Sequence, residues 1–186
     1  MSRRPGAGLV AGQESEGSLS GAGQLWIWRE RKPLRSSSVE ETAAVLVDLD
    51  GVLADARGRQ RFLQDPMPDW YGFFASCGED PVIGEIKVLL DLMDSALRVV
   101  LLTARPSTIV AETQDWIALH EIRWDLLVMR VGRAYDSTRG YKEAAVAELR
   151  RHGFQLLLAL EDDRRNVEMF RSRGVPTIYI HSGYYD

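Results

Sequence analysis

The sequence predicts an α/β fold in which a parallel β-sheet is flanked by helices. Two observations support this prediction. From Ala43 onward, short apolar runs alternate with longer segments of helical character, which is typical of a parallel sheet covered on both faces. In addition, polar or charged residues directly follow several of the apolar runs. Because ligands of such sheets bind beyond the carboxyl ends of the strands, we expect these polar residues to form a site at one edge.

The predicted elements follow in order along the chain. The first apolar run is short, Val-rich and stopped by Gly51, as expected of a buried strand. The later strands are similar apolar runs, and a helical segment separates each strand from the next. The expected strands span residues 44–48, 99–102, 126–129, 155–160 and 177–180. The expected helices span residues 82–95, 108–119, 141–152 and 164–173.

Residues 1–40 are expected to be a flexible or loosely packed segment in front of one domain at residues 41–186. The first 23 residues are rich in Gly, Ser and Glu and hold few large apolar side chains, a composition that disfavours a packed core. Trp26 and Trp28 then alternate within a short apolar island. This island could add an edge strand, pack on the body of the domain or form a docking patch, and we favour packing.

Composition indicates a soluble globular protein. A chain of 186 residues suits one domain with a substantial core, and 45% hydrophobic and 27% charged residues are ordinary for that class. No apolar run approaches the roughly 20 residues that span a bilayer, so no membrane partner is expected. Cys77 is the only cysteine, which excludes an internal disulfide and fits a reducing cytoplasm. The net charge of −4 gives no argument for nucleic-acid binding.

Two aspartates follow the first predicted strand. Asp48 and Asp50 lie two residues apart, so they would share a face if the strand continued. A carboxylate at this position costs desolvation free energy unless a metal ion or a hydrogen-bonding partner meets it. By itself, the pair is equally compatible with a solvated acidic turn.

Three further signals make a functional site the better interpretation. The second predicted strand is followed by a hydroxyl and a guanidinium, a lysine opens a later helix, and the fourth strand is followed by acidic residues. One edge of the sheet would then hold the groups that bind a divalent cation and a phosphate together. These residues are Thr103, Arg105, Lys142, Glu161, Asp162 and Asp163.

The four motifs resemble those of the haloacid dehalogenase-like (HAD) hydrolase superfamily. They are DLDGVLAD at 48–55, LLTARP at 101–106, Lys142 and LEDDRRNVEMF at 160–170. Three segments, at 115–117, 127–130 and 162–170, resemble more closely the 3′-phosphatase domain of bacteriophage polynucleotide kinase. The resemblance implies a HAD-type, Rossmann-like parallel sheet. It implies no large cap domain, because only about 26 residues separate the first motif from the next helix.

The resemblance also implies catalytic roles. Asp48 would be the nucleophile that forms an aspartyl-phosphate, and Asp50 would protonate the leaving oxygen and later deprotonate a water. Thr103 would donate to a phosphate oxygen, and Lys142 would place a positive charge between nucleophile and phosphate. The remaining expected phosphate-binding residues are Ala104, Arg105 and Arg130, of which the two arginines could clamp phosphate by bidentate bonds.

A magnesium ion is the implied cofactor, because Mg²⁺ prefers all-oxygen sites with few protein ligands. The implied ligands are the Asp48 carboxylate, the Asp50 backbone carbonyl and Asp162, with Asp163 bound directly or through water. Glu161 is expected to be a neighbour of the ion and no ligand.

The region between the first motif and the helix at 82–95 leaves two interpretations open for two groups of residues. Its aromatic residues either anchor a loop on the body or form a lip that stacks a base or ring. Its arginines are either solvated on the surface or surround the site and attract a polyanion. The residues are Trp70, Tyr71, Phe73 and Phe74, and Arg57, Arg59 and Arg61.

The sequence thus predicts a hydrolase, a magnesium-dependent phosphatase that acts on the 3′-phosphate of a polynucleotide end. The expected partner is therefore a nucleic-acid end. A phosphatase of a small nucleotide or another small phosphomonoester is the alternative, since the net charge is negative. A catalytically degenerate binding module is a further alternative, against which the presence of both aspartates, the lysine and the Asp-Asp pair speaks.

Overall fold

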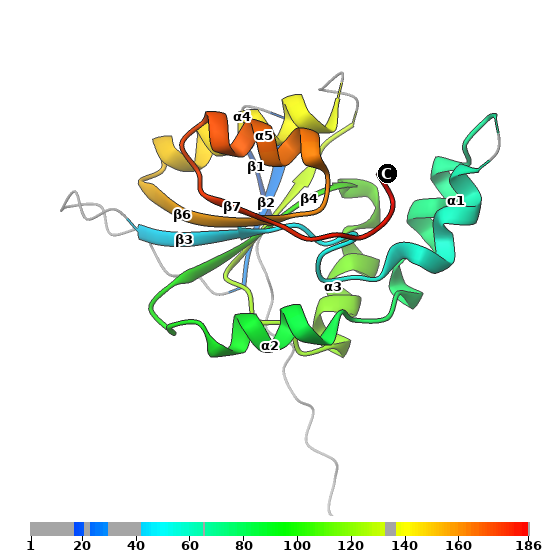
Figure 1. Cartoon of the computed structure of the whole chain (residues 1–186), viewed down its shortest axis with the longest axis horizontal. Helices are drawn as coiled ribbons and strands as arrows, with labels where there is room; N and C mark the ends of the chain where they lie inside the picture. The colour runs from blue at the N-terminus through cyan, green and yellow to red at the C-terminus, as the bar shows by residue number, and fades with distance from the viewer. Residues whose placement is uncertain (1–16, 21–22, 30–41, 65, 133–136, 186) are drawn as a thin grey trace, which may run out of the picture.

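A computed structural model describes residues 17–20, 23–29, 42–64, 66–132 and 137–185. These residues form one seven-stranded sheet in the order β1-β2-β5-β4-β3-β6-β7. Helices cover both of its faces (Figure 1). The predicted α/β fold with a helix-flanked sheet is therefore confirmed.

The predicted strands are all present and parallel to one another. They are β3 (Thr42–Val47), β4 (Arg98–Pro106), β5 (Leu126–Arg130), β6 (Phe154–Glu161) and β7 (Thr177–Tyr179). Strand β3 pairs with β4 on one side and with β6 on the other, so the residues after β3 leave the middle of the sheet.

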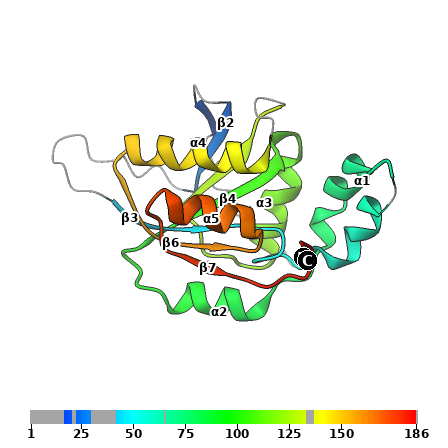
Figure 2. The ribbon, with the colours of Figure 1, turned by 45° about the horizontal axis from the view of Figure 1, so that its top comes forward.

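The main helices divide between the two faces. They are α2 (Gly84–Leu92), α3 (Val110–Leu119), α4 (Thr138–Arg151) and α5 (Arg164–Ser172). Alternate residues of β3 point to opposite faces: Leu46 belongs to a core with residues of α4 and α5, and Val47 to a core with residues of α2 and α3. Figure 2 shows α4 and α5 together on one side of the sheet and α2 on the other.

The two largest differences between predicted and observed helix ends, of three residues each, have local reasons. Helix α2 ends at Leu92 and not at Ser95, because Met93 is extended and the Asp94 side chain accepts a hydrogen bond from the Ala96 N–H at 2.8 Å. Helix α4 begins at Thr138 because the Ser137 hydroxyl accepts from the Gly140 N–H at 3.1 Å.

The sheet is longer than predicted because the chain before β3 also contributes strands. Strands β1 (Gly17–Ser20) and β2 (Gln24–Trp28) are antiparallel to each other, and β2 is antiparallel to β5. Trp26 and Ile27 are only 4% and 3% exposed and enter the cores on opposite faces. The apolar island therefore forms a strand that covers the β5 edge, which would otherwise expose unpaired backbone groups. Residues 1–16 and 30–41 lie outside the described residues, so the boundary at residue 40 stays a prediction.

Among the described residues between the first motif and α2, no large cap domain is present, as predicted. The segment instead forms three short helices, η1 (Ala56–Leu63), α1 (Trp70–Ala75) and η2 (Cys77–Glu79). A further short helix, η3 (Ser107–Ile109), precedes α3. Helix α1 stands beside the sheet, near the last described residues (Figure 1). Across the described part of the chain, every helix is too short or too polar to cross a membrane.

We expect Trp26→Ala to lower the free energy of unfolding by about 3–5 kcal/mol, because it leaves a cavity in the core that Trp26 shares with residues of α4 and α5. Urea denaturation measures the loss. Trp70→Ala is the matched control, since Trp70 is 54% exposed and its removal should cost less than about 1 kcal/mol. Equal losses for the two variants would contradict the buried position of β2.

Candidate active site

The motif residues meet at the carboxyl edge of the sheet around a cavity of about 890 Å³. Three of the predicted residues, Arg105, Lys142 and Asp162, are at most 1% exposed and do not belong to its lining. The others contribute to the lining, which includes Asp48, Asp50, Thr103, Ala104, Arg130 and Asp163.

Lys142 lies between two carboxylates at the base of the site. Its Nζ is 2.6 Å from Oδ2 of Asp48 and 2.6 Å from Oε2 of Glu161. Burial alone would lower the pKa of Lys142, but these two carboxylates raise it above its usual value. The lysine is therefore a fixed positive charge that joins the ends of β3 and β6 to the second turn of α4.

Asp48 has an excess of negative charge around it. Burial raises the pKa of Asp48 well above its usual value; Lys142 acts against this shift, and the carboxylates of Glu161 and Asp162 add to it. Ligand oxygens of Asp48, Glu161 and Asp162 all lie within 4.8 Å of one another. This concentration of carboxylates favours the presence of a cation.

Asp162 fits the role of a metal ligand. Both of its carboxylate oxygens are buried without a hydrogen-bond partner among the described residues, and burial raises its pKa to about 7. The oxygens of Glu161 are by contrast engaged, because Oε2 meets Lys142 and Oε1 accepts from the N–H groups of Asp162 and Asp163 at 3.1 and 3.0 Å. A buried carboxylate without a partner is costly, so the oxygen donors present fit a hard cation such as Mg²⁺.

Asp163 is held in a different way. It caps the start of α5, and its two oxygens accept from Arg165, with Nε at 3.0 Å from Oδ1 and Nη2 at 2.8 Å from Oδ2. Burial alone would raise the pKa of Asp163, but the hydrogen bonds and the positive charge of Arg165 act in the opposite direction, and the pKa lies below its usual value. Among the described residues, the acidic cluster that could hold a metal does not include Asp163. This arrangement therefore does not favour a direct bond from Asp163 to a metal ion.

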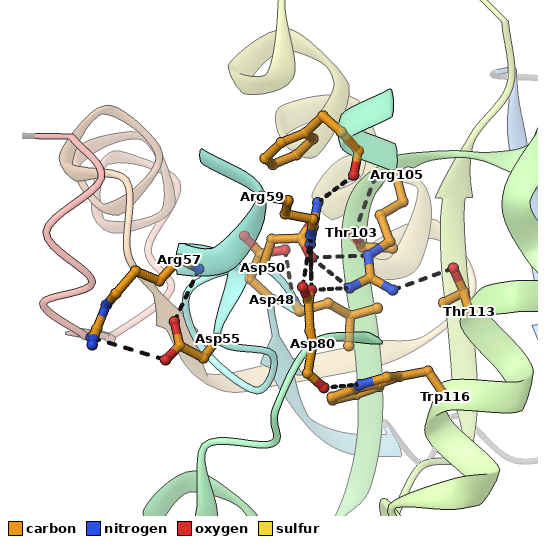
Figure 3. A network of polar contacts seen from close by, with 12 residues as sticks. Asp48, Asp50, Asp55, Arg57, Arg59, Asp80, Thr103, Arg105, Thr113 and Trp116 are labelled. Atoms are coloured by element: carbon orange, nitrogen blue, oxygen red, sulfur yellow. Dashed lines mark hydrogen bonds and ion pairs between the residues drawn. The ribbon is translucent and has the colours of Figure 1, made fainter. Parts of the chain in front are cut away.

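Asp50 is bound by two buried arginines (Figure 3). Arg105 donates to Oδ1 from Nε at 2.9 Å and from Nη2 at 2.6 Å, and Nη2 of Arg59 donates to the same oxygen at 2.5 Å. Burial would raise the pKa of Asp50, but the two guanidiniums hold it below its usual value. No bond from a described residue ends on Oδ2, which leaves that oxygen available to a ligand.

Asp80 supports the same two arginines. It is 6% exposed and accepts from Arg59 Nε and Nη2 at 2.9 and 2.6 Å, and it lies 3.5 Å from Arg105 Nη2. Figure 3 shows its carboxylate close to that of Asp50, with dashed lines from both carboxylates to both guanidiniums. The buried carboxylate of Asp80, the half-buried carboxylate of Asp50 and two buried guanidiniums thus compensate one another.

This network changes the expected roles of two arginines. Arg105, expected to clamp phosphate, is 0% exposed and directed at Asp50. Arg59, considered as a surface residue or as one attracting a polyanion, is 2% exposed and fully committed to ion pairs. The physical reason is that carboxylates withdrawn from water, fully at Asp80 and partly at Asp50, need counterions. Arg57 and Arg61 remain exposed.

Arg130 keeps a position suited to anion binding. It ends β5, lines the cavity, and its buried Nε has no hydrogen-bond partner among the described residues. Thr103 also lines the cavity, and its Oγ1 accepts from the Arg105 N–H at 3.1 Å, which leaves its own O–H as a donor.

Sequence reasoning missed several residues of the site, among them Asp80, Arg165 and Asn166. Asp80 carries no local signal, because it lies in a loop and meets Arg59 from 21 positions away. Arg165 and Asn166 belong to the fourth motif and could have been considered there. Asn166 is 2% exposed and lines the cavity, and its Oδ1 has no partner among the described residues.

Comparison with known proteins gives one family match. Residues 42–185 match the family described as the polynucleotide kinase PNKP phosphatase domain. A comparison with curated protein sequences found no significant match.

Several solved structures share the fold. Two are chains of the Pnkp1/Rnl/Hen1 complex, described in one case as an RNA repair complex; both are 22% identical, with TM-scores of 0.64 and 0.65, and the matches cover 83% and 82% of this chain. A class C acid phosphatase from Bacillus anthracis with tungstate bound is 12% identical, with a TM-score of 0.56, over 78% of this chain and 69% of its own. This chain spans only 50% and 47% of the two chains of the complex. At these identities the likeness concerns the fold.

We expect Gly51→Ala to weaken Mg²⁺ binding at least tenfold. Gly51 has a φ of +84°, which costs an L-residue about 1–2 kcal/mol, and an added Cβ would lie 2.0 Å from Oδ2 of Asp162. The substitution must therefore displace the carboxylate that fits a metal ligand. The rise in Tm on titration with Mg²⁺ measures the affinity.

Gly58→Ala is the matched control for this prediction. A Cβ at Gly58 meets no atom within 4 Å, so the variant should respond to Mg²⁺ as the native protein does. An unchanged Mg²⁺ response in Gly51→Ala would argue against a metal site at Asp162.

Proposed function

This chain belongs to the family of polynucleotide kinase PNKP phosphatase domains and is a hydrolase of the HAD type, and on that basis we propose that it removes the phosphate from a polynucleotide 3′ end. The observation that carries the proposal is the pairing of Asp48 with Lys142 at the base of a cavity whose wall also contains Asp50. A nucleophile, a fixed positive charge and a second carboxylate are the groups that phosphoryl transfer to a side chain requires.

Asp48 acts as the nucleophile in this proposal. One of its carboxylate oxygens attacks phosphorus, and the bond from phosphorus to the 3′ oxygen of the polynucleotide breaks, which leaves an aspartyl-phosphate. Water then attacks phosphorus, releases inorganic phosphate and restores the carboxylate. Lys142, protonated and 2.6 Å from Asp48, lowers the energy of the negative charge that develops on the phosphoryl oxygens.

Asp50 acts as the general acid and then as the general base. Its lowered pKa keeps it ionised in the free protein. Arrival of a phosphate dianion raises the pKa of a nearby carboxyl by like-charge repulsion, so substrate binding promotes protonation of Asp50. The bonds from Arg59 and Arg105 fix Oδ1, and Oδ2 then gives the proton to the leaving oxygen and later accepts one from water.

The other cavity residues bind the phosphate and the cation. The Thr103 hydroxyl, the backbone beside Ala104 and the free Nε of Arg130 are donors for phosphate oxygens. Asp48, Asp162 and the backbone carbonyl of Asp50 would hold Mg²⁺, with Asp163 linked through water. When bound, the ion would neutralise charge on the phosphoryl oxygens.

A nucleic-acid end is the substrate favoured by the family and by the exposed arginines Arg57 and Arg61 near the cavity-lining residue Gln60. A small nucleotide is the second candidate, because a cavity of about 890 Å³ can hold one and the net charge is −4. A cytoplasmic location stays a prediction from the single cysteine.

We expect Asp48→Asn to lower the turnover of a 3′-phosphorylated oligonucleotide by at least about 10⁴-fold, because an amide cannot form the aspartyl-phosphate. The variant should keep its fold, since the amide relieves repulsion from Glu161 and Asp162. Initial rates measure turnover, and circular dichroism checks the fold. Activity close to that of the native protein would disprove the covalent mechanism.

We expect a 3′-phosphorylated oligonucleotide to have a higher kcat/KM than the matching mononucleotide, and the advantage should shrink as salt rises. Arg61→Glu should weaken the oligonucleotide several-fold more than the mononucleotide, because Arg61 is exposed beside the cavity-lining residues of η1. Arg150→Glu is the control, since this exposed residue lies at the opposite end of α4 from Lys142. Equal efficiency for both substrates at all salt concentrations would favour the small nucleotide.

A further inference from the structure

Three aromatic residues of α1 form one wall of the cavity, and together we call Trp70, Phe73 and Phe74 the aromatic lip. The rings of Trp70 and Phe74 are inclined by only 27° with centroids 6.0 Å apart. Phe73 meets both of them edge-on, at centroid distances of 5.8 and 5.3 Å. The three rings therefore support one another as a unit.

Anchoring of the loop explains only part of this cluster. Phe73 is 6% exposed and serves as the anchor. Trp70 contacts both phenylalanines, yet it is 54% exposed and belongs to the cavity wall, so more than half of its surface is not used for packing. Aromatic side chains that stay accessible in a binding groove are platforms on which nucleic-acid bases stack.

Arg59 connects the lip to Asp50. The Arg59 guanidinium lies 4.2 Å above the centre of the Phe73 ring, and its Nη1 donates to the Phe73 carbonyl at 3.3 Å. The same guanidinium donates to Oδ1 of Asp50. The aromatic lip is therefore held next to the carboxylate assigned to the leaving oxygen, and the Lys142 pair with Asp48 and Glu161 lies in a separate network.

This connection indicates which part of a substrate the lip would meet. A phosphate alone fills a small fraction of a cavity of about 890 Å³, so the rest of the space belongs to the group that carries the leaving oxygen. That group must lie on the side of Asp50 if Asp50 protonates it. Gln60 and Gln64 also line the cavity, and their amides are donors and acceptors of the kind that base edges require.

Resting on the proposed function, we infer that the aromatic lip binds the heteroaromatic base of the nucleotide that bears the phosphate, by stacking on Trp70 and Phe74. The leaving group is then a nucleoside and not a bare sugar or alcohol. Gln60 and Gln64 meet the edge of the base. Stacking on aromatic side chains tolerates different bases, so discrimination among them is weak.

The test compares two oligonucleotides with a 3′-terminal phosphate, of which one ends in thymidine and the other in a stable tetrahydrofuran residue that lacks the base. In the native protein, kcat/KM should be about 10- to 100-fold higher for the substrate with the base. Trp70→Ala should reduce this ratio to near one, and Trp70→Phe should retain most of it.

Tyr71→Ala is the matched control, because Tyr71 neighbours Trp70 in α1, is 86% exposed and is absent from the cavity lining. Its ratio should equal that of the native protein. A native ratio near one, or a Trp70→Ala variant that loses activity on both substrates equally, would overturn the inference and restrict the lip to anchoring.

A binding measurement tests this inference separately from the proposed function. If neither oligonucleotide is dephosphorylated, the proposed function fails, and fluorescence anisotropy of the two labelled oligonucleotides then decides about the lip. Tighter binding of the substrate with the base, lost in Trp70→Ala and kept in Tyr71→Ala, supports the stacking site. Equal binding of the two oligonucleotides overturns it.

Discussion

The buried guanidinium of Arg59 holds together the two parts of the site, which are the sheet edge that carries Asp50 and the aromatic lip of α1. It joins Asp50 at the edge of the sheet, Asp80 in the loop before α2, and the ring of Phe73 in α1. These three groups belong to three different segments of the chain, and Arg59 itself lies in a fourth, the short helix η1. Removal of one member of a buried, hydrogen-bonded charge cluster costs about 3–5 kcal/mol, because the remaining charges lose their compensation. The same interactions that stabilise the fold here therefore set the position of a candidate catalytic carboxylate.

The two aspartates of the first motif have opposite electrostatic surroundings although they lie two residues apart. Asp50 and Asp80 face Arg59 and Arg105, two charges of each sign, and the pKa of Asp50 is lowered. Asp48, Glu161 and Asp162 face Lys142 alone, so three negative charges meet one positive charge and the pKa of Asp48 is raised. The formal excess on this second side is two negative charges, which a divalent cation would balance. The division predicts where an ion belongs and why a lysine by itself leaves the cluster uncompensated.

Local sequence patterns predict the parallel strands and the edge of the sheet at which the motifs meet. They do not predict which side chains pair when the residues are far apart in the sequence. Buried strands such as β3 are recognisable because they are uninterrupted apolar runs. Strand β2 is harder to predict from the sequence, because an apolar island of a few residues from Leu25 to Trp28 fits an edge strand and also a segment packed on the body of the domain. Arg105 follows a predicted strand as expected, but its direction depends on Asp50, 55 positions away. Asp163 was expected near a metal, and Arg165, two residues further on, engages both of its oxygens.

The short helices after the first motif are held at two points, at Asp55 before η1 and at Phe73 in α1. This affects the free energy of binding a ligand to them. At their start, the Tyr184 hydroxyl donates to Oδ1 of Asp55 at 2.7 Å, and Asp55 in turn caps η1 through the Arg57 N–H at 3.0 Å. Further along, Arg59 fixes Phe73. A wall fixed in this way loses little conformational entropy when a ring stacks on it, so most of the stacking free energy remains available for binding. Because Arg59 also holds Asp50, a ligand seated on the wall would have its leaving oxygen at a set distance from the proton donor. A few short helices could thus serve the orienting purpose for which a separate cap domain would otherwise be needed.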